Sequence, residues 1–125
     1  MAFKYTNVNP LDLTEEDCVT RAIALGSGLS YAEVQDKLYY ISKLLDCEKL
    51  CVCCYHHLLD NVLGYDRLPC KNLTVGEVAE MYDDCILLIR IQGHLTCSVF
   101  GVIHDLWDCS NSYADIVWLV KESNM

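Results

Sequence analysis

Residues 85–107 read CILLIRIQGHLTCSVFGVIHDLW, an apolar run rich in β-branched residues and broken by short turns. Residues 85–92 have the length and composition of a buried strand. Residues 95–99 and 102–107 flank Phe100-Gly101, a two-residue hairpin signal, since glycine readily adopts the positive φ such turns need. Another apolar run at 116–121 predicts a last strand. We therefore expect an antiparallel sheet over about residues 85–121.

The sequence before this sheet is typical of helices. A Ser or Thr followed three residues later by an acid, the pattern of a capping box, occurs three times. The three pairs are Thr14/Asp17, Ser30/Glu33 and Thr74/Glu77. Helices are expected at about 14–25, 30–45, 51–63 and 74–81. Helices over about 14–81 followed by strands over 85–121 predict one α+β domain spanning 1–125, with N-terminal helices packed on a C-terminal antiparallel sheet.

The amino-acid composition argues against some classes of partner for this protein's surface. The chain has 125 residues, of which 53% are hydrophobic, enough for one core. Its 18 acidic and 9 basic residues give a net charge of −9. Such a surface repels phosphate backbones and anionic lipids, so neither nucleic acid nor a membrane is an expected partner. The charge leaves the oligomeric state open.

Nine cysteines raise the question of redox compartment. The odd number and irregular spacing do not suit a disulfide framework, and the first ten residues, MAFKYTNVNP, lack the pattern of a secretory signal. No apolar run approaches the roughly 20 residues of a membrane span. We expect a cytoplasmic protein in which most cysteines are reduced thiols that fill core space.

Cys18 stands apart from the other cysteines because it falls in the first turn of the first predicted helix, or at its first position if Asp17 rather than Thr14 is the N-cap. A thiol there is close to free N–H groups and to the positive end of the helix dipole, which favour the thiolate. The neighbouring Glu15, Glu16 and Asp17 oppose this effect by raising the thiol pKa. A nearby imidazolium would therefore have to supply much of the activation.

The predicted hairpin offers that imidazole. With Phe100-Gly101 as a two-residue turn, paired positions sum to 201, so His94 and Asp105 are diagonal neighbours on one face. A carboxylate that holds one ring nitrogen fixes the tautomer and leaves the other nitrogen for a thiol. Trp107 lies on the same face and could cover this hydrogen bond. His104 and Asp108 fall on the opposite face.

These motifs resemble the papain-like cysteine hydrolase superfamily, in which a Cys at a helix N-terminus, a His at the head of a strand and an Asn or Asp on the next strand follow in this order. The spacing of Asp105 and Trp107 matches the superfamily's third residue and its shielding tryptophan. The chain also resembles small phage and prophage proteins with a DCxxRAxA opening and a GHLT…GVIHDxWDCS ending. The resemblance implies a papain-like fold with Cys18, His94 and Asp105 as the catalytic triad.

The expected activity is hydrolysis of an amide bond, peptidase-like or deamidase-like, in a protein or peptide substrate such as a host protein. The alternative is a non-catalytic phage-type binding or inhibitor protein on a degenerate papain-like fold. One departure bears on this choice: the glutamine that usually precedes the nucleophile by about six residues and completes the oxyanion hole is missing. Asn7, Asn9 and Thr14 are the candidates to replace it.

Cysteines and histidines gather in residues 47–70. Cys51 and Cys54 have a zinc-ligand spacing, and Cys53 with His57 forms an i, i+4 pair. A small zinc protein is therefore a third class, but no second C-x-x-C motif follows, and we expect neither a metal nor another cofactor. The full set is Cys47, Cys51, Cys53, Cys54, His56, His57 and Cys70. Six acidic residues are expected on a solvated face: Asp12, Glu15, Glu16, Asp17, Asp83 and Asp84.

Overall fold

The computed structural model describes residues 2–11, 17–48 and 51–122. Within them it contains four α-helices, one π-helical turn and a six-stranded sheet of order β1-β5-β4-β3-β6-β2. The helices are α1 (Cys18–Ser27), α2 (Tyr31–Leu45), α3 (Val52–His57), continued by η1 (Leu58–Val62), and α4 (Val75–Met81). The strands are β1 (Ala2–Tyr5), β2 (Asp66–Leu68), β3 (Cys85–Ile91), β4 (His94–Val99), β5 (Val102–Asp105) and β6 (Ile116–Glu122).

The α+β class is therefore confirmed, but the sheet is mixed rather than antiparallel. Strand β1 pairs parallel to β5, whereas the other strand pairs are antiparallel. Strands β1 and β2 were not expected from the sequence; they have four and three residues and lie at the sheet edges. Strands this short show too few alternations for a periodic signal.

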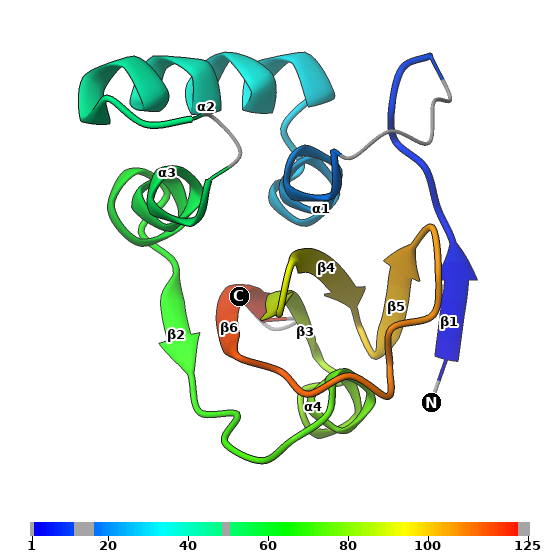
Figure 1. Ribbon diagram of the computed structural model, residues 1–125. Helices are drawn as coiled ribbons and strands as arrows, with labels where there is room; N and C mark the ends of the chain where they lie inside the picture. The colour runs from blue at the N-terminus through cyan, green and yellow to red at the C-terminus, as the bar shows by residue number, and fades with distance from the viewer. Residues whose placement is uncertain (1, 12–16, 49–50, 123–125) are drawn as a thin grey trace.

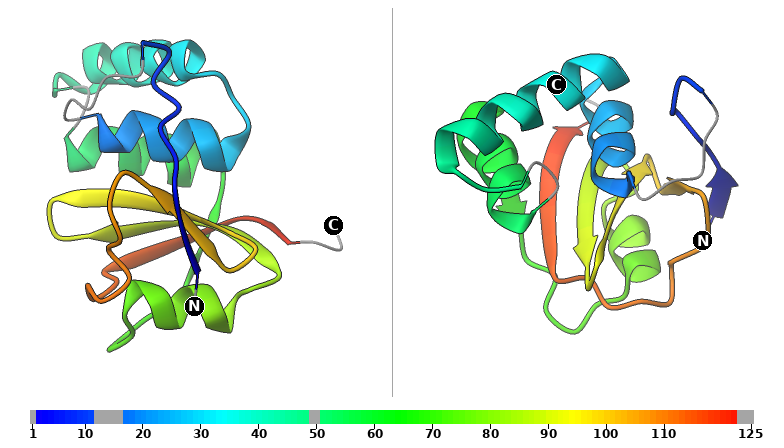
Figure 2. Two further views of the ribbon diagram at one scale, coloured as in Figure 1. Left: turned by 90° about the vertical axis from the view of Figure 1, so that its right-hand side faces the viewer. Right: turned by 45° about the horizontal axis from the view of Figure 1, so that its top comes forward.

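The sheet separates two apolar cores. Helices α1, α2 and α3 lie over one face and α4 over the other (Figures 1 and 2). Strand β3 serves both cores: Leu88 packs with the helices of the first face, and Leu87, Ile89 and Ile91 pack with α4 on the second. A strand covered on both faces reads as a continuous apolar run, which is the pattern seen in the sequence.

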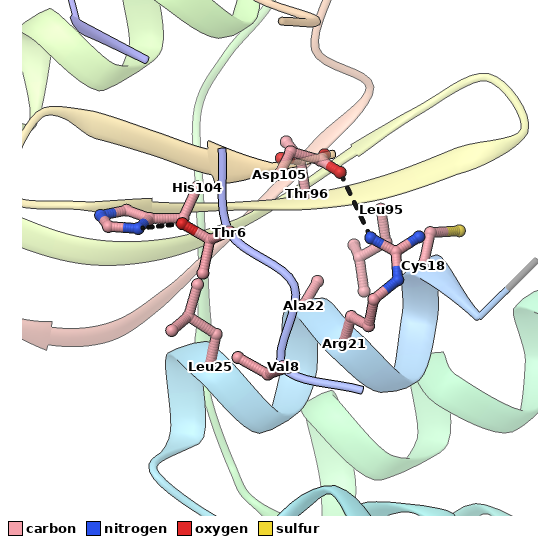
Figure 3. A pocket seen from close by; sticks show the side chains of 10 residues that line it. All are labelled: Thr6, Val8, Cys18, Arg21, Ala22, Leu25, Leu95, Thr96, His104 and Asp105. Carbon is pink, nitrogen blue, oxygen red and sulfur yellow. Dashed lines mark hydrogen bonds and ion pairs between the residues drawn. The ribbon is translucent and has the colours of Figure 1, made fainter. Parts of the chain in front are cut away.

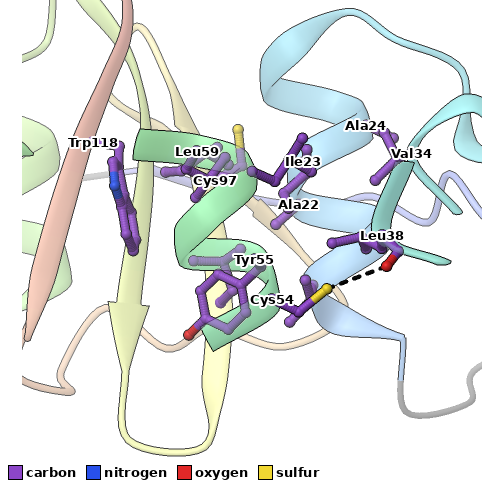
Figure 4. Packing of buried hydrophobic residues seen from close by; sticks show 14 of the residues in the cluster. Ala22, Ile23, Ala24, Val34, Leu38, Cys54, Tyr55, Leu59, Cys97 and Trp118 are labelled. Atoms are coloured by element: carbon purple, nitrogen blue, oxygen red, sulfur yellow. Dashed lines mark hydrogen bonds between the residues drawn. The ribbon is translucent and has the colours of Figure 1, made fainter. Parts of the chain in front are cut away.

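The first core packs α1 against β4. Ile23 of α1, Leu38 of α2 and Cys97 of β4 are fully buried in it, together with Trp118 of β6 (Figure 4). Gly26 of α1 permits a close approach, because a Cβ there would meet the Leu88 side chain at 3.1 Å. This packing fixes the start of α1 relative to the start of β4.

The predicted hairpin register is confirmed. Val99 pairs with Val102 and Cys97 with His104, so paired positions sum to 201. Phe100 and Gly101 both have positive φ, 49° and 86°, as a type I′ turn requires. The capping boxes at Ser30/Glu33 and Thr74/Glu77 are also formed.

Two helix predictions need correction. The first helix begins at Cys18 with Asp17 as its N-cap, and the Asp17 side chain makes no capping hydrogen bond; Thr14 lies outside the described residues. The predicted helix over 51–63 divides into α3 and the π-helical η1. None of the helices in the described ranges has the length and apolar character needed to span a membrane.

Candidate active site

The start of α1 supplies the candidate nucleophile. Cys18 is the first residue of α1, and the first helical hydrogen bond runs from the Arg21 N–H to the Asp17 carbonyl. The N–H groups of Cys18, Val19 and Thr20 consequently have no acceptor within the helix. Cys18 is only partly buried, so its thiol remains within reach of a ligand.

The start of β4 supplies the imidazole. His94 follows Gly93, whose φ of 74° forms the tight turn between β3 and β4. Its Nε2 lies 2.6 Å from Oδ2 of Asp105, the last residue of β5. Because Nε2 is bonded to the carboxylate, Nδ1 is the ring nitrogen left for another partner. The predicted His94–Asp105 pair is present.

The thiol of Cys18 lies against this pair. It lies close enough to the His94 ring and to the backbone of Leu95 for both to affect its pKa. Burial alone would raise the pKa of Cys18, but hydrogen bonding with these two groups and the positive charges of His94 and Arg21 lower it below its ordinary value of 9.0. Thiolate is the form favoured by these contacts.

His94 is shifted in the complementary direction. Burial opposes its charged form, but hydrogen bonds with Asp105, Cys109 and Cys18 raise its pKa from 6.5 to about 11. With a pKa near 11, His94 carries its proton at neutral pH, and the lowered pKa of Cys18 favours a thiolate beside that imidazolium.

Asp105 is a buried carboxylate, not a solvent-facing one. It is 4% exposed. Burial tends to raise its pKa, but hydrogen bonds with His94 and with the Leu106 N–H, the latter at 2.7 Å, hold its pKa below the ordinary value. Its backbone is also fixed, because its carbonyl accepts the Thr6 N–H at 2.9 Å beside β1. Asp105 therefore stays ionised and holds the imidazole in one orientation.

Arg21 connects the two sides of the site. One turn after Cys18 on α1, its guanidinium lies 3.5 Å from Oδ1 of Asp105 (Figure 3). Its Nε donates to Oδ1 of Asp17 at 2.5 Å. Arg21 is 8% exposed, so both contacts are shielded from water. The Arg21–Asp105 ion pair joins α1 to β5, one helical turn from the candidate nucleophile.

Asp17 is buried, contrary to the expectation that it lies on a solvated acidic face. It is 6% exposed, and its Oδ2 accepts hydrogen bonds from the Tyr31 hydroxyl at 2.6 Å and from the Asn9 amide at 2.9 Å. Burial opposes ionisation, yet these donors and Arg21 lower its pKa. The charge expected to oppose a Cys18 thiolate is thus balanced by Arg21; Glu15 and Glu16 lie outside the described residues.

The oxyanion donors differ from those considered from the sequence. The Asn9 amide group donates to Asp17 and, at 3.3 Å, to the Tyr31 hydroxyl, and its Oδ1 accepts the Leu11 N–H. Asn9 is therefore committed to holding the segment before α1. The Asn7 side chain accepts the Asn9 N–H, and Thr14 is outside the described residues. The backbone N–H groups at the start of α1 remain as donors.

Trp107 and Cys109 complete the surroundings of His94. The Trp107 ring packs against the imidazole with centroids 5.1 Å apart while remaining 48% exposed. The Cys109 thiol, 3.9 Å from Oδ2 of Asp105, was not singled out by the sequence, because nothing in its spacing distinguishes it from the other cysteines. His104 bonds to Thr6 and Asp108 to Ser110, so neither takes part.

The cysteine-rich segment does not form the pairs that its spacing suggested. Cys54 is buried and donates to the Leu38 carbonyl, and Cys70 belongs to the core on the opposite face of the sheet. His57 bonds to Asn61. The thiols that meet are instead Cys47, Cys51 and Cys53.

Comparison with protein-family models, with curated proteins and with solved structures finds no match to this chain. The function is therefore inferred from the geometry of the site.

Proposed function

We propose that the protein is a cysteine hydrolase of papain-like type that cleaves an amide bond through Cys18, His94 and Asp105. The observation that carries the proposal is the chain of contacts from the Cys18 thiol through the His94 ring to the buried Asp105 carboxylate. Three groups from the start of α1, the start of β4 and the end of β5 meet in the order that nucleophilic catalysis requires.

In the first half-reaction, the Cys18 thiolate attacks the carbonyl carbon of the amide. The N–H groups at the start of α1 stabilise the negative charge that develops on the carbonyl oxygen. The His94 imidazolium then gives its proton to the leaving nitrogen, the C–N bond breaks, and an acyl-thioester on Cys18 remains. Asp105 keeps the ring oriented throughout.

In the second half-reaction, the now neutral His94 takes a proton from a water molecule, which attacks the thioester. The C–S bond breaks, the carboxylic acid leaves, and the thiolate–imidazolium pair returns. The balance is one amide and one water converted to one acid and one amine, so no further co-reactant is needed. The substrate class is a protein or peptide, and both backbone and side-chain amides fit this chemistry.

Selective alkylation tests the proposal. The protein is treated with substoichiometric iodoacetamide at neutral pH, and the nine cysteines are mapped by mass spectrometry. Cys18 is expected to react at least tenfold faster than the exposed Cys53, since it is held as a thiolate. Equal rates at Cys18 and Cys53 would favour a non-catalytic binding protein on the same fold.

Activity is tested on a peptide library and on proteins from a bacterial lysate, with Cys18→Ser as the inactive variant and Cys53→Ser as the matched control. New termini, or side-chain amides converted to acids, should appear with the wild type and Cys53→Ser and be absent with Cys18→Ser. Products that persist with Cys18→Ser would contradict the proposal.

A further inference from the structure

A second group of thiols lies at the junction of α2 and α3, separate from the candidate active site. Cys47 follows the left-handed residue Asp46 that ends α2, Cys51 is the N-cap of α3, and Cys53 lies in the first turn of α3. The chain therefore turns back between two helices and brings residues four and six positions apart to one place.

The three sulfur atoms converge. All lie within 4.8 Å of one another, and those of Cys51 and Cys53 are 2.7 Å apart. Thiolates around a tetrahedral zinc ion, with Zn–S bonds of about 2.3 Å, lie about 3.8 Å from each other. The sulfur atoms of Cys51 and Cys53 would therefore have to move apart by about 1 Å to share one ion with Cys47.

The cluster is also accessible. Cys53 is exposed and Cys47 and Cys51 are partly exposed, whereas Cys54, Cys70, Cys85, Cys97 and Cys109 are buried. Thiols that merely fill space would be expected among the buried set. Three that meet at the surface instead leave room for an ion to enter and for a water molecule to serve as a fourth ligand.

We propose that Cys47, Cys51 and Cys53 form a three-thiolate site for a soft metal ion of the zinc type. Soft thiolate ligands select such ions over Mg²⁺ or Ca²⁺. This ligand set differs from the Cys51/Cys54 and Cys53/His57 pairs considered from the sequence, and the expectation that no metal binds is replaced. The ion would crosslink the end of α2 to the start of α3.

The proposal is tested with Zn²⁺ alone. Fully reduced protein is mixed with excess Zn²⁺ under anaerobic conditions, passed over a desalting column, and analysed for bound zinc per chain. One equivalent is expected for the wild type and none for Cys47→Ser, Cys51→Ser or Cys53→Ser. Because Cys53 is exposed, Cys53→Ser is expected to keep the far-ultraviolet circular dichroism of the wild type, so loss of zinc cannot be assigned to unfolding.

Two matched variants make the result specific. Cys18→Ser and Cys109→Ser should retain one equivalent, since those thiols belong to the candidate active site. Zinc lost with Cys109→Ser but retained with Cys53→Ser would place the ion at His94, Asp105 and Cys109, which also lie within 4.8 Å of one another, and would overturn the proposal. So would reduced protein that retains no zinc, including the case in which air oxidation gives only a Cys51–Cys53 disulfide.

The metal site and the proposed hydrolase can fail separately. Zinc binding is measured without substrate, and the alkylation of Cys18 is measured on metal-free protein. Loss of either result leaves the other unaffected.

Discussion

The two accessible groups of cysteine side chains in the described part of the chain differ in what surrounds the sulfur. At the start of α1, one thiol lies beside an imidazole that is bonded to a buried carboxylate, and a buried arginine is one helical turn away. At the junction of α2 and α3, three thiols meet mainly one another. The first arrangement lowers the pKa of Cys18, and the second raises that of Cys47 to about 12. The pKa of each thiol in this protein therefore depends on the groups that lie beside it.

The difference extends to the scaffold. The contacts of Cys18 come from α1 and β4, which are fixed by the same apolar core, and Asp105 is held at the end of β5. Nucleophilic catalysis needs such rigid placement, because small errors in position are costly in rate. The cysteine cluster depends on a single connection between helices, a setting that a metal ion could order and that would not by itself position a catalytic group.

Replacing the imidazole should have the largest effect on the first group. In His94→Ala, amide hydrolysis should fall by about 10²–10⁴-fold, because general acid–base catalysis is lost. The alkylation rate of Cys18 at neutral pH should also fall, since its pKa is no longer lowered by His94. His104→Ala is the matched control, as His104 is on the same hairpin but bonds to Thr6. An equal loss of hydrolysis in both variants would contradict the assignment.

Replacing the carboxylate should affect stability as well as reactivity. Asp105→Asn removes the buried charge that faces His94 and Arg21, at an expected cost of about 3–5 kcal/mol in the free energy of unfolding at neutral pH. The alkylation rate of Cys18 should fall less than in His94→Ala, because the imidazole remains. Urea denaturation measures the stability, and Asp108→Asn, which loses only contacts to Ser110, is the control.

The effect of Asp105→Asn on the free energy of unfolding should depend on pH. The pKa of Asp105 is lowered in the folded protein, so its carboxylate stabilises the fold above an unfolded pKa of about 3.9. That stabilisation is lost as the pH falls through the lower folded-state value. The wild type should therefore approach Asp105→Asn in stability under acid conditions. A difference that stays constant from neutral to acid pH would refute this account of Asp105.

Asp17 should give the smallest effect of the three on reactivity. Asp17→Asn places an amide among three donors, from Asn9, Tyr31 and Arg21, and should cost about 1.5–3 kcal/mol of stability. The alkylation rate of Cys18 should change by only a few-fold, since Arg21 keeps its contact with Asp105. Asp36→Asn, on the exposed side of α2, is the control. A variant as stable as that control would mean that the buried network is not important for folding.

The hairpin register and the starts of two helices could be predicted from the sequence. The Phe100-Gly101 turn fixes the hairpin register, and the register places His94 beside Asp105. The capping boxes likewise located the starts of α2 and α4. These features depend on residues close in the chain, where spacing is a sufficient guide.

Features that depend on contacts between distant segments could not be predicted from the sequence. Asp17 reads as one acid among several, and only the arrival of Asn9, Tyr31 and Arg21 makes it a buried anion. Strand β1 has no partner until β5 lies beside it. Cys47 meets Cys51 and Cys53 only because the chain reverses between α2 and α3. Each of these features therefore depends on tertiary contacts.

The central claim is that Cys18 and His94 form a thiolate–imidazolium pair, and the protonation of His94 tests it most directly. Nitrogen NMR of histidine-labelled protein reports both ring nitrogens across about pH 5–8. The account predicts that His94 remains doubly protonated over this range, with a pKa of about 11, and that Asp105→Asn lowers that pKa. A His94 that titrates near 6.5 in the wild type, as an ordinary histidine does, would contradict it.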